Sequence, residues 1–534
     1  MSSSQRREQR GMSVFVGAVS LVFIIPVVGL MVDVAFLYAV KARLQAAVDG
    51  ASLAAARALN LGQSTASQAS SARQNAVNWF YANLPLNVWG TSNTHMDTST
   101  VQVFDDPNNP RVRNVTVTAS TSVKTYFMNW FHPAATIVSA QGNASRRDVV
   151  VMMVLDRSGS MQNASACGTM ITAAKLFTGQ FAAGRDQLGL VSFSDNVYLH
   201  SAPTTNFQTV LGYKNDLGTG SGALDTITCA GGTSTAQAIS VAYNELFKKN
   251  LPGALNVIMF ETDGLPNTLT MNFWDSATGT PGITAASACT DRNSKKMSQG
   301  GFGSAAVLPQ WTAGQALGSG GHFADIPAGI VGAVASDDPG STNKLFLLFN
   351  YWTTSTSNNF NSSKYITNAA APGCAFTNSS YQHVSPPPAD IAWFPTKDVW
   401  GNMLKPPYTY LTVNLSNGRV PANSYTTFHN AVLNATDYAA YQARTNATLP
   451  VYFFGVGLGG TSSSPPDYVL MQRMANDPNG DNYNRPPLYQ ACATEANCVT
   501  SSGQPQGTFI FSANTATLSQ SFLAISSQVL RLSK

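Results

Sequence analysis

The sequence predicts a doubly wound α/β domain with a mostly parallel sheet, preceded by a membrane-spanning helix and a small α+β unit. Three features carry this prediction. Residues 11–32 contain no charged side chain, residues 115–119 alternate apolar and polar side chains, and apolar runs after residue 147 alternate with helix-like stretches. A chain of 534 residues is too long for one core, so we expect two or three folding units.

The composition excludes some classes of partner. Only 11% of the residues are charged, whereas soluble domains average about 25%. The net charge is +4, and no basic stripe is present that could follow a phosphate backbone. We therefore expect no nucleic-acid partner, and the neutral polar surface is typical of exported proteins.

The N-terminal segment predicts a membrane anchor. Its apolar part reads GMSVFVGAVSLVFIIPVVGLMV, and at about 1.5 Å per residue it can cross a bilayer core of about 30 Å. Arg6, Arg7 and Arg10 precede this part, which predicts a single membrane pass with residues 1–10 in the cytoplasm. The bulk of the chain would then be periplasmic or extracellular, although Lys41 and Arg43 weaken the charge asymmetry.

A cleaved signal peptide is the alternative interpretation of this segment. Its apolar region would be shorter and would be followed at once by a small-residue cleavage site. Here the helical period continues beyond the span, with apolar residues at three- and four-residue steps from Leu37 to Leu59. The pattern favours one anchor helix over residues 11–62.

This segment resembles the N-terminal region of TadE/TadG-like proteins of the Tad (Flp) pilus system. The resemblance lies in the Arg-rich start, in Met31-Val32-Asp33-Val34 at the end of the span, and in the continuation FLYAVKARLQAAVDGASLAAARAL. Prepilins of the family are cut after a Gly and carry Glu at the fifth residue beyond it. After Gly11 that position is Val16, so the resemblance is to the unprocessed, TadG-like branch. The resemblance implies a single-pass protein of the bacterial inner membrane.

Residues 63–146 predict a small α+β, pilin-like region. The stretch SQASSARQNAVNWFYANLP predicts a helix that ends at Pro85. The stretches RVRNVTVTAS and TIVSAQGNAS predict two strands, the first with Val115, Val117 and Ala119 on one face.

Residues 147–534 predict the α/β domain. The apolar runs DVVVMMVLD, QLGLVSFS, NVIMFETDG and LPVYFFGVG are typical of parallel strands buried on both faces. GTFIFSAN predicts the last strand, and TLSQSFLAISSQVLRL predicts a final helix with one apolar stripe. Asp156 and Asp263 follow two of these strands, at the sheet edge where doubly wound folds bind ligands.

Three short motifs in this domain resemble the von Willebrand factor type A family. They are the D-x-S-x-S run from Asp156, the loop Gly231-Gly232-Thr233, and Thr262-Asp263-Gly264. In that family they form a metal-ion-dependent adhesion site. The resemblance implies that Ser158, Ser160 and Thr233 offer hydroxyl oxygens to Mg²⁺ or Mn²⁺, and that Asp156 and Asp263 bind it largely through water. The alternative is a domain that keeps the fold and has lost the metal.

The chemistry of such a site implies a partner. Mg²⁺ prefers six hard oxygen ligands at about 2.1 Å and keeps several waters. Three neutral hydroxyls leave its charge under-neutralised, so a carboxylate of a protein partner can complete the coordination shell.

Residues 266–422 predict a large insertion after the third strand. It is rich in Gly, Ser, Thr and Asn, and it contains Trp274, Trp311, Trp352, Trp393 and Trp400. These tryptophans could choose the partner beside the metal, but we expect them to form a small core of the insertion itself.

Six cysteines in an exported chain predict disulfides. Cys492 and Cys498 are close in sequence, Cys167 and Cys229 flank the motif loops, and Cys289 and Cys374 lie in the insertion. These positions suggest the pairs Cys167–Cys229, Cys289–Cys374 and Cys492–Cys498, which are one of the fifteen possible connectivities of six cysteines. No C-x-x-C pair is present to favour zinc.

Two further motifs are interpreted as structural. Gly455-Val456-Gly457-Leu458-Gly459-Gly460 matches G-x-G-x-x-G, but TSSSPPD follows it instead of a helix, so we expect a strand-end turn. The run from Asp477 to Asp481 lacks the later Glu of a calcium loop and predicts an Asx turn.

No catalytic residue is predicted. The sequence has no Walker loop, no H-E-x-x-H and no G-x-S-x-G, and His200 has no obvious nucleophile beside it in sequence. The combined features predict a membrane-anchored binding or assembly protein of a Tad-type pilus or surface-attachment system. The alternative is an envelope type A adhesin or chaperone-like protein without a pilus role.

Overall fold

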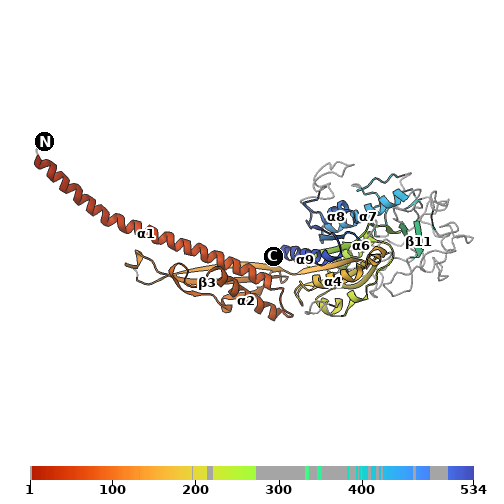
Figure 1. The fold of residues 1–534 in the computed structure, drawn as a ribbon, viewed down its shortest axis with the longest axis horizontal. Coiled ribbons are helices and arrows are strands. Elements are labelled where there is room, and N and C mark those ends of the chain that lie inside the picture. The colour runs from red at the N-terminus through yellow and green to blue at the C-terminus, as the bar shows by residue number, and fades with distance from the viewer. Residues whose placement is uncertain are drawn as a thin grey trace, which may run out of the picture. The chain divides into compact units, whose positions relative to one another are not determined.

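The computed structural model describes residues 3–130, 133–194, 197–212, 221–271, 425–460, 465–480 and 503–533, with short pieces between them at 331–335, 346–350, 382–383, 393–394, 396–398, 400–406, 410–415 and 420–421. The chain divides into two compact units, one from Met1 to Arg147 and one from Asp148 to Ser533 (Figure 1).

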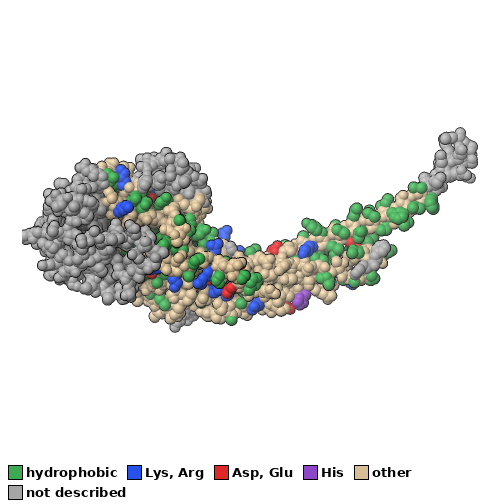
Figure 2. All heavy atoms as spheres, turned by 180° about the vertical axis from the view of Figure 1, so that it is seen from behind, with side chains coloured by type: hydrophobic (Ala, Val, Ile, Leu, Met, Phe, Trp, Pro, Cys, Tyr) green, Lys and Arg blue, Asp and Glu red, His purple; other side chains and the backbone are tan. Residues whose placement is uncertain are grey.

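The first unit is built on one long helix, α1 (Ser3–Ala58), which continues through Pro26. From Phe15 onward it is long and apolar enough to cross a membrane, and almost none of its apolar window is buried within the unit. Figure 2 shows mainly hydrophobic side chains along this part of the helix. The C-terminal half of α1 is different, because Leu44, Val48 and Ala55 are fully buried in the unit's core.

A second helix and a four-stranded antiparallel sheet complete the first unit. Helix α2 (Thr65–Asn83) begins at the capping residue Ser64 and ends before Pro85, as predicted. The two predicted strands are β3 (Val112–Val123) and β4 (Thr136–Arg147), which pair as a long antiparallel hairpin, and Val115, Val117 and Ala119 are buried. β1 (Thr91–His95) and β2 (Val101–Asp105), which the sequence analysis did not identify, pair with the other edge of β3. Three short 3₁₀ turns are η1 (Val88–Gly90), η2 (Thr98–Thr100) and η3 (Met128–Trp130).

The second unit contains the predicted doubly wound sheet. Its strand order is β16-β15-β8-β5-β6-β7, and all neighbours are parallel except β6 and β7. The strands are β5 (Val149–Asp156), β6 (Gln187–Phe193), β7 (Val197–Thr204), β8 (Leu255–Thr262), β15 (Tyr452–Leu458) and β16 (Phe509–Ser512). Every residue of β5, β6 and β8 is buried, which confirms the prediction of strands covered on both faces. The antiparallel edge strand β7 was not predicted.

Helices cover both faces of this sheet (Figure 1). On one face, Val151 and Met153 of β5 pack with α4 (Cys167–Thr178) and α9 (Thr515–Leu532). The predicted apolar stripe of α9 is fully buried there: Leu518, Phe522, Ile525 and Val529. On the other face, Met152 and Val154 pack with α6 (Thr235–Lys249), α7 (Tyr425–Thr445) and α8 (Tyr468–Ala475). Short helices α3 (Gly159–Asn163), α5 (Phe207–Leu211) and η4 (Ala223–Thr226) lie in the connections.

The described part of the insertion forms further strands. β9 (Thr268–Met271), β10 (Val331–Ala335), β11 (Phe346–Asn350) and β12 (Gln382–His383) make an antiparallel sheet, and β13 (Trp393–Phe394) pairs with β14 (Val420–Pro421). The prediction of a separate tryptophan core is wrong for Trp400. Its side chain is buried in the core that the main sheet shares with α6 and α7, because the chain returns to that face before α7 begins. Trp274, Trp311 and Trp352 lie outside the described residues.

Candidate functional site

The site begins at Asp156, the last residue of the central strand β5. Its Oδ1 accepts a hydrogen bond of 2.7 Å from the Ser158 N–H, and its Oδ2 accepts one of 2.5 Å from Thr262 Oγ1 at the end of β8. β5 and β8 are neighbouring parallel strands, so their carboxyl ends meet at one edge of the sheet. The order of connections reverses between these strands, which is where doubly wound folds bind ligands.

Three oxygen atoms from two segments, the turn after β5 and the end of β8, converge next to Asp156. Ser160 Oγ donates to Asp263 Oδ1 at 2.6 Å, Ser158 Oγ is 2.9 Å from Ser160 Oγ, and Ser158 Oγ donates weakly to Asp263 Oδ1 at 3.4 Å. We call Ser158 Oγ, Ser160 Oγ and Asp263 Oδ1 the oxygen triangle. The structure therefore brings together four of the five residues predicted for the metal site.

The fifth residue, Thr233, is positioned through the backbone of its loop. The Gly159 N–H donates to Gly231 O at 2.8 Å, which joins this loop to the serine turn. Gly231 has φ +95°, a conformation that favours glycine. The Thr233 N–H donates to Asn267 Oδ1 at 2.7 Å, and the Asn267 N–H donates back to Thr233 O at 3.0 Å. Thr233 is buried beside the other four residues' segments.

Acidic side chains are concentrated at this edge of the sheet. Asp156, Glu261 and Asp263 are all fully buried. Burial and the Asp263 carboxylate raise the pKa of Asp156 to about 7. Burial, followed by the Asp156 and Asp263 carboxylates, raises the pKa of Glu261 well above its usual range. Isolated buried carboxylates are costly, so a bound cation would stabilise this arrangement.

The donor set fits a small divalent cation. Ligands on one face of an octahedron are about 3 Å apart when the metal–oxygen distance is about 2.1 Å. The edges of the oxygen triangle, 2.6, 2.9 and 3.4 Å, have this size. Among the described residues, no group of three or more His, Cys, Asp or Glu side chains is arranged to hold a metal. A cation at this edge would therefore depend on the serine hydroxyls, which suit Mg²⁺ or Mn²⁺.

Three residues that shape the site were missed in the sequence. Thr262 orients Asp156, Asn267 holds the Thr233 loop, and Glu261 adds the third buried carboxylate. Glu261 and Thr262 directly precede Asp263 in the sequence, so their place at the end of a predicted strand could have identified them as neighbours of the site. Asn267 gave none, because its partner is 34 residues away in the chain.

A disulfide joins Cys167 to Cys229. Cys167 begins α4, after the serine turn, and Cys229 precedes the Gly231 loop, so the bond links the two segments that carry Ser160 and Thr233. This is the pairing suggested by their positions in the sequence. Cys289, Cys374, Cys492 and Cys498 lie outside the described residues.

His200 has a hydroxyl neighbour that the sequence did not reveal. Ser192 Oγ lies 2.7 Å from His200 Nε2, because β6 and β7 are adjacent antiparallel strands. Ser192 is fully buried within the sheet, and the His200 ring packs edge-on against Tyr198. A buried hydroxyl within a strand is inaccessible to a substrate, so the pair stabilises the edge of the sheet.

The two motifs interpreted as structural behave as such. A Cβ on Gly457 would lie 2.9 Å from the Phe509 ring, so the glycines of this motif allow β15 and β16 to pack closely. Asp477 Oδ1 accepts from the Asn479 N–H at 2.9 Å, as in an Asx turn, and its Oδ2 accepts from the Phe509 N–H. Asp481 lies outside the described residues.

Two family models match the chain. The von Willebrand factor type A domain model matches residues 151–265, which include all five predicted metal-site residues. The Flp pilus-assembly TadE/G-like model matches residues 11–58. The second unit is thus a von Willebrand factor type A domain, and the matches support a pilus-related role in adhesion or assembly. Together with the apolar helix, they indicate a membrane-anchored protein.

No curated protein matches the chain. Among solved structures, the PilB minor pilin from Streptococcus sanguinis is 10% identical with a TM-score of 0.31, over 84% of this chain and 80% of that chain. The von Willebrand factor domain of the type V pili tip protein Mfa5 from Porphyromonas gingivalis is 16% identical with a TM-score of 0.32, over 73% and 98%. The pilus adhesin SpaC from Lactobacillus rhamnosus GG is 13% identical with a TM-score of 0.29, over 81% and 36%.

The disulfide makes a prediction for stability. A chain with both Cys167→Ser and Cys229→Ser loses a cross-link across 62 residues, which should lower the free energy of unfolding of this unit by about 4 kcal/mol. Thermal unfolding by circular dichroism, with and without reductant, measures the effect. Reductant should lower the melting temperature of the parent to that of the double variant. Equal melting of the two chains without reductant would contradict the prediction.

His200 makes a prediction for pH dependence. Burial, together with the Arg157 guanidinium, lowers the pKa of His200 from 6.5 to about 3. The unfolded chain therefore takes up a proton below pH 6.5 that the folded chain refuses, and stability is lost as the pH falls through this window. Between pH 7.5 and 5, we expect the parent to lose about 1–2 kcal/mol more than His200→Gln. Denaturant titrations at several pH values measure the free energy of unfolding of both chains. If it changes equally with pH in the parent and in His200→Gln, the pKa of His200 is not lowered in the folded chain, which contradicts the prediction.

Proposed function

We propose that this protein is an export-side binding or assembly component of a Tad (Flp) type pilus or surface-attachment system, and that it recognises its partner through a metal ion at the oxygen triangle. The observation that carries the proposal is the convergence of Ser158, Ser160 and Asp263 at the carboxyl ends of β5 and β8. Asp156 and Thr233 complete the set of oxygen donors.

The chemistry of these residues supports recognition rather than catalysis. A bound Mg²⁺ or Mn²⁺ would supply a positive charge that two hydroxyls and one carboxylate neutralise only in part. Asp263, which the sequence analysis expects to act largely through water, would here bind the ion directly. The two serines and Asp263 would hold the ion, Asp156 would be kept behind them by Thr262, and a carboxylate of the partner would complete the shell. Recognition of this kind requires no base or nucleophile from the chain.

The N-terminal unit supports the location of this activity. The family match over residues 11–58 belongs to pilus assembly, and α1 carries an exposed apolar span. Arg6, Arg7 and Arg10 favour a cytoplasmic N-terminus at the inner membrane, with the type A domain on the export side. The alternative, an envelope type A protein without a pilus role, has no structural observation that favours it over the Tad match.

Surface attachment of cells tests the proposal. In cells that carry Ser160→Ala, the oxygen triangle loses one corner, and attachment should fall to the level of parent cells treated with a chelator. Ser526→Ala is the control, because it removes a serine hydroxyl of the same domain that lies on α9 and bonds to Leu523 O instead of facing the oxygen triangle. Attachment is counted at equal protein level, with and without added Mg²⁺.

The outcome separates the parts of the proposal. Loss of attachment in Ser160→Ala alone supports metal-dependent recognition. Normal attachment and normal pili in both variants, with no effect of the chelator, would contradict it.

A further inference from the structure

The tip of the β3–β4 hairpin covers one face of α1 at the end of the apolar span. Gly29 and Asp33 are buried although their neighbours on α1 are exposed. They lie on one side of the helix, since four residues make about one turn. We call residues 124–130 and 133–137 the hairpin tip.

Asp33 holds the hairpin tip against the helix. Its Oδ1 accepts a hydrogen bond of 2.8 Å from the Tyr126 N–H, and its Oδ2 accepts bonds of 2.8 and 2.6 Å from the N–H groups of Phe127 and Met128. Asp33 is the first charged residue after the charge-free segment. Hydrogen bonds to a carboxylate are among the stronger ones, so the contact fixes the tip at the end of the span.

Phe127 reaches further along the helix, into the charge-free segment. A Cβ built on Gly29 would clash with the Phe127 ring, so the ring lies directly on the Gly29 backbone. Gly29 precedes Asp33 by about 6 Å along the helix axis. Any membrane that surrounds the end of the apolar span must therefore also reach Phe127. Tyr126 lies alongside, with its ring 6.1 Å from that of Phe36.

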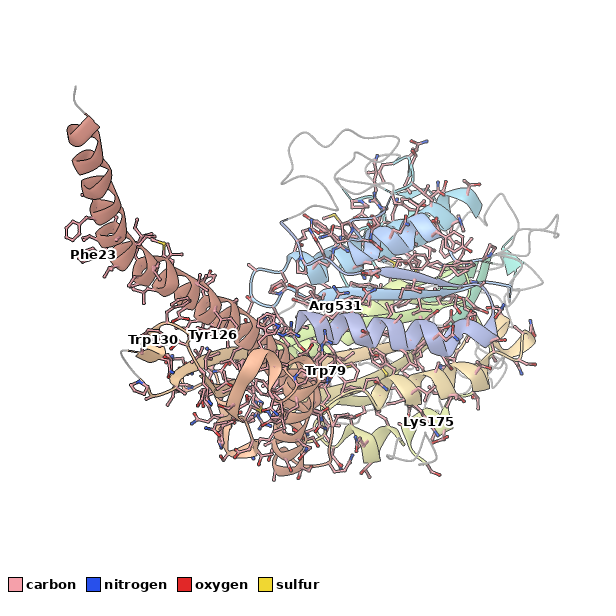
Figure 3. The ribbon with its side chains drawn as sticks, turned by 60° about the vertical axis from the view of Figure 1, so that its left-hand side comes forward. Phe23, Trp79, Tyr126, Trp130, Lys175 and Arg531 are labelled. Carbon is pink, nitrogen blue, oxygen red and sulfur yellow. A yellow bond between two sulfur atoms is a disulfide. The ribbon has the colours of Figure 1, made fainter. Side chains whose placement is uncertain are left out.

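The exposed side chains of the tip suit a lipid interface. Tyr126 is 69% exposed, Trp130 87% and Ile137 73%, and residues 124–137 include Lys124 but no Asp or Glu. Figure 3 shows Tyr126 and Trp130 together at the end of the hairpin beside α1, away from Trp79. Tryptophan and tyrosine concentrate at the headgroup level of membranes, and lysine can extend its ammonium into water there.

We propose that the hairpin tip enters the headgroup–acyl boundary of the bilayer that α1 crosses. The proposal rests on membrane anchoring by α1, which is part of the proposed function. The tip then acts as a second membrane contact that sets the depth and rotation of the helix. The occupant is lipid because the tip is continuous with the apolar span and lies at the same level as Gly29.

Quenching of tryptophan by brominated lipid tests the proposal. The full chain is placed in phosphatidylcholine–phosphatidylglycerol vesicles with bromine near the headgroup end of the acyl chains. The quenched part of the emission should fall in Trp130→Phe and stay unchanged in Trp79→Phe. Trp79 is the matched control, because it is 50% exposed in the same unit but lies on α2.

A pair of glycine variants tests the geometry. Gly29→Leu should displace Phe127 and reduce the quenching of Trp130, whereas Gly17→Leu should leave it unchanged, because nothing lies within 4 Å of a Cβ at Gly17. Both variants make the span more apolar by the same amount, so α1 should insert equally well.

Flotation of the vesicles measures whether α1 anchors the chain in the membrane, independently of whether the hairpin tip enters it. If the chain floats with the vesicles and Trp130→Phe changes no quenching, the tip lies outside the membrane and the inference is overturned while the anchor stands. If the chain does not float, the anchor is wrong and the inference falls with it. Quenching that depends on Trp130 and on Gly29, but not on Gly17, supports the inference.

Discussion

The hydrogen bond between Ser160 Oγ and Asp263 Oδ1 joins residues that are 103 positions apart in the chain. It exists because β5 and β8 are neighbours in register, which brings Leu155 opposite Glu261 and places the following loops side by side. The alternating residues of β5 reach both cores, so the position of Asp156 depends on α4 and α9 on one face and on α6 and α7 on the other. The site is thus an outcome of the packing of the whole domain.

Charge is the second constraint on this arrangement. Three buried carboxylates at one edge oppose folding unless something offsets their repulsion. Hydrogen bonds from Thr262 and Ser158 offset part of it, and the disulfide restrains the two segments that approach the carboxylates. A divalent cation would offset the rest. In the proposed function, the outward side of such an ion would take a carboxylate of the partner, which would connect the stability of the domain to recognition.

The sequence predicted what depends on local patterns. Continuous apolar runs identified β5, β6, β8 and β15. The residues after β5 and β8 were expected to lie together, because parallel strands place their carboxyl ends at one edge, and the structure brings Ser158, Ser160 and Asp263 together. The apolar stripe of α9 followed from helical periodicity alone. The edge strand β7 was not predicted, because its half-exposed residues do not form a continuous apolar run.

Long-range contacts could not be predicted in this way. The Ser192–His200 pair depends on an antiparallel register with bulges, and the burial of Trp400 depends on where the insertion returns to the main sheet. The contact of Asp33 with the hairpin tip joins residues more than 90 positions apart, and no sequence pattern around Asp33 predicts this contact. Such contacts are decided by tertiary packing, which a single sequence does not display.

Titration of the full chain in detergent with Mn²⁺, followed by electron paramagnetic resonance of the free ion, measures whether the oxygen triangle binds a metal. We expect one bound Mn²⁺ per parent chain, displaced by Mg²⁺, and none in Ser160→Ala or Asp263→Asn. Ser526→Ala should bind as the parent does. Equal binding by the parent and Ser160→Ala, or no binding by the parent at millimolar Mn²⁺, would contradict the claim that the oxygen triangle is a metal site.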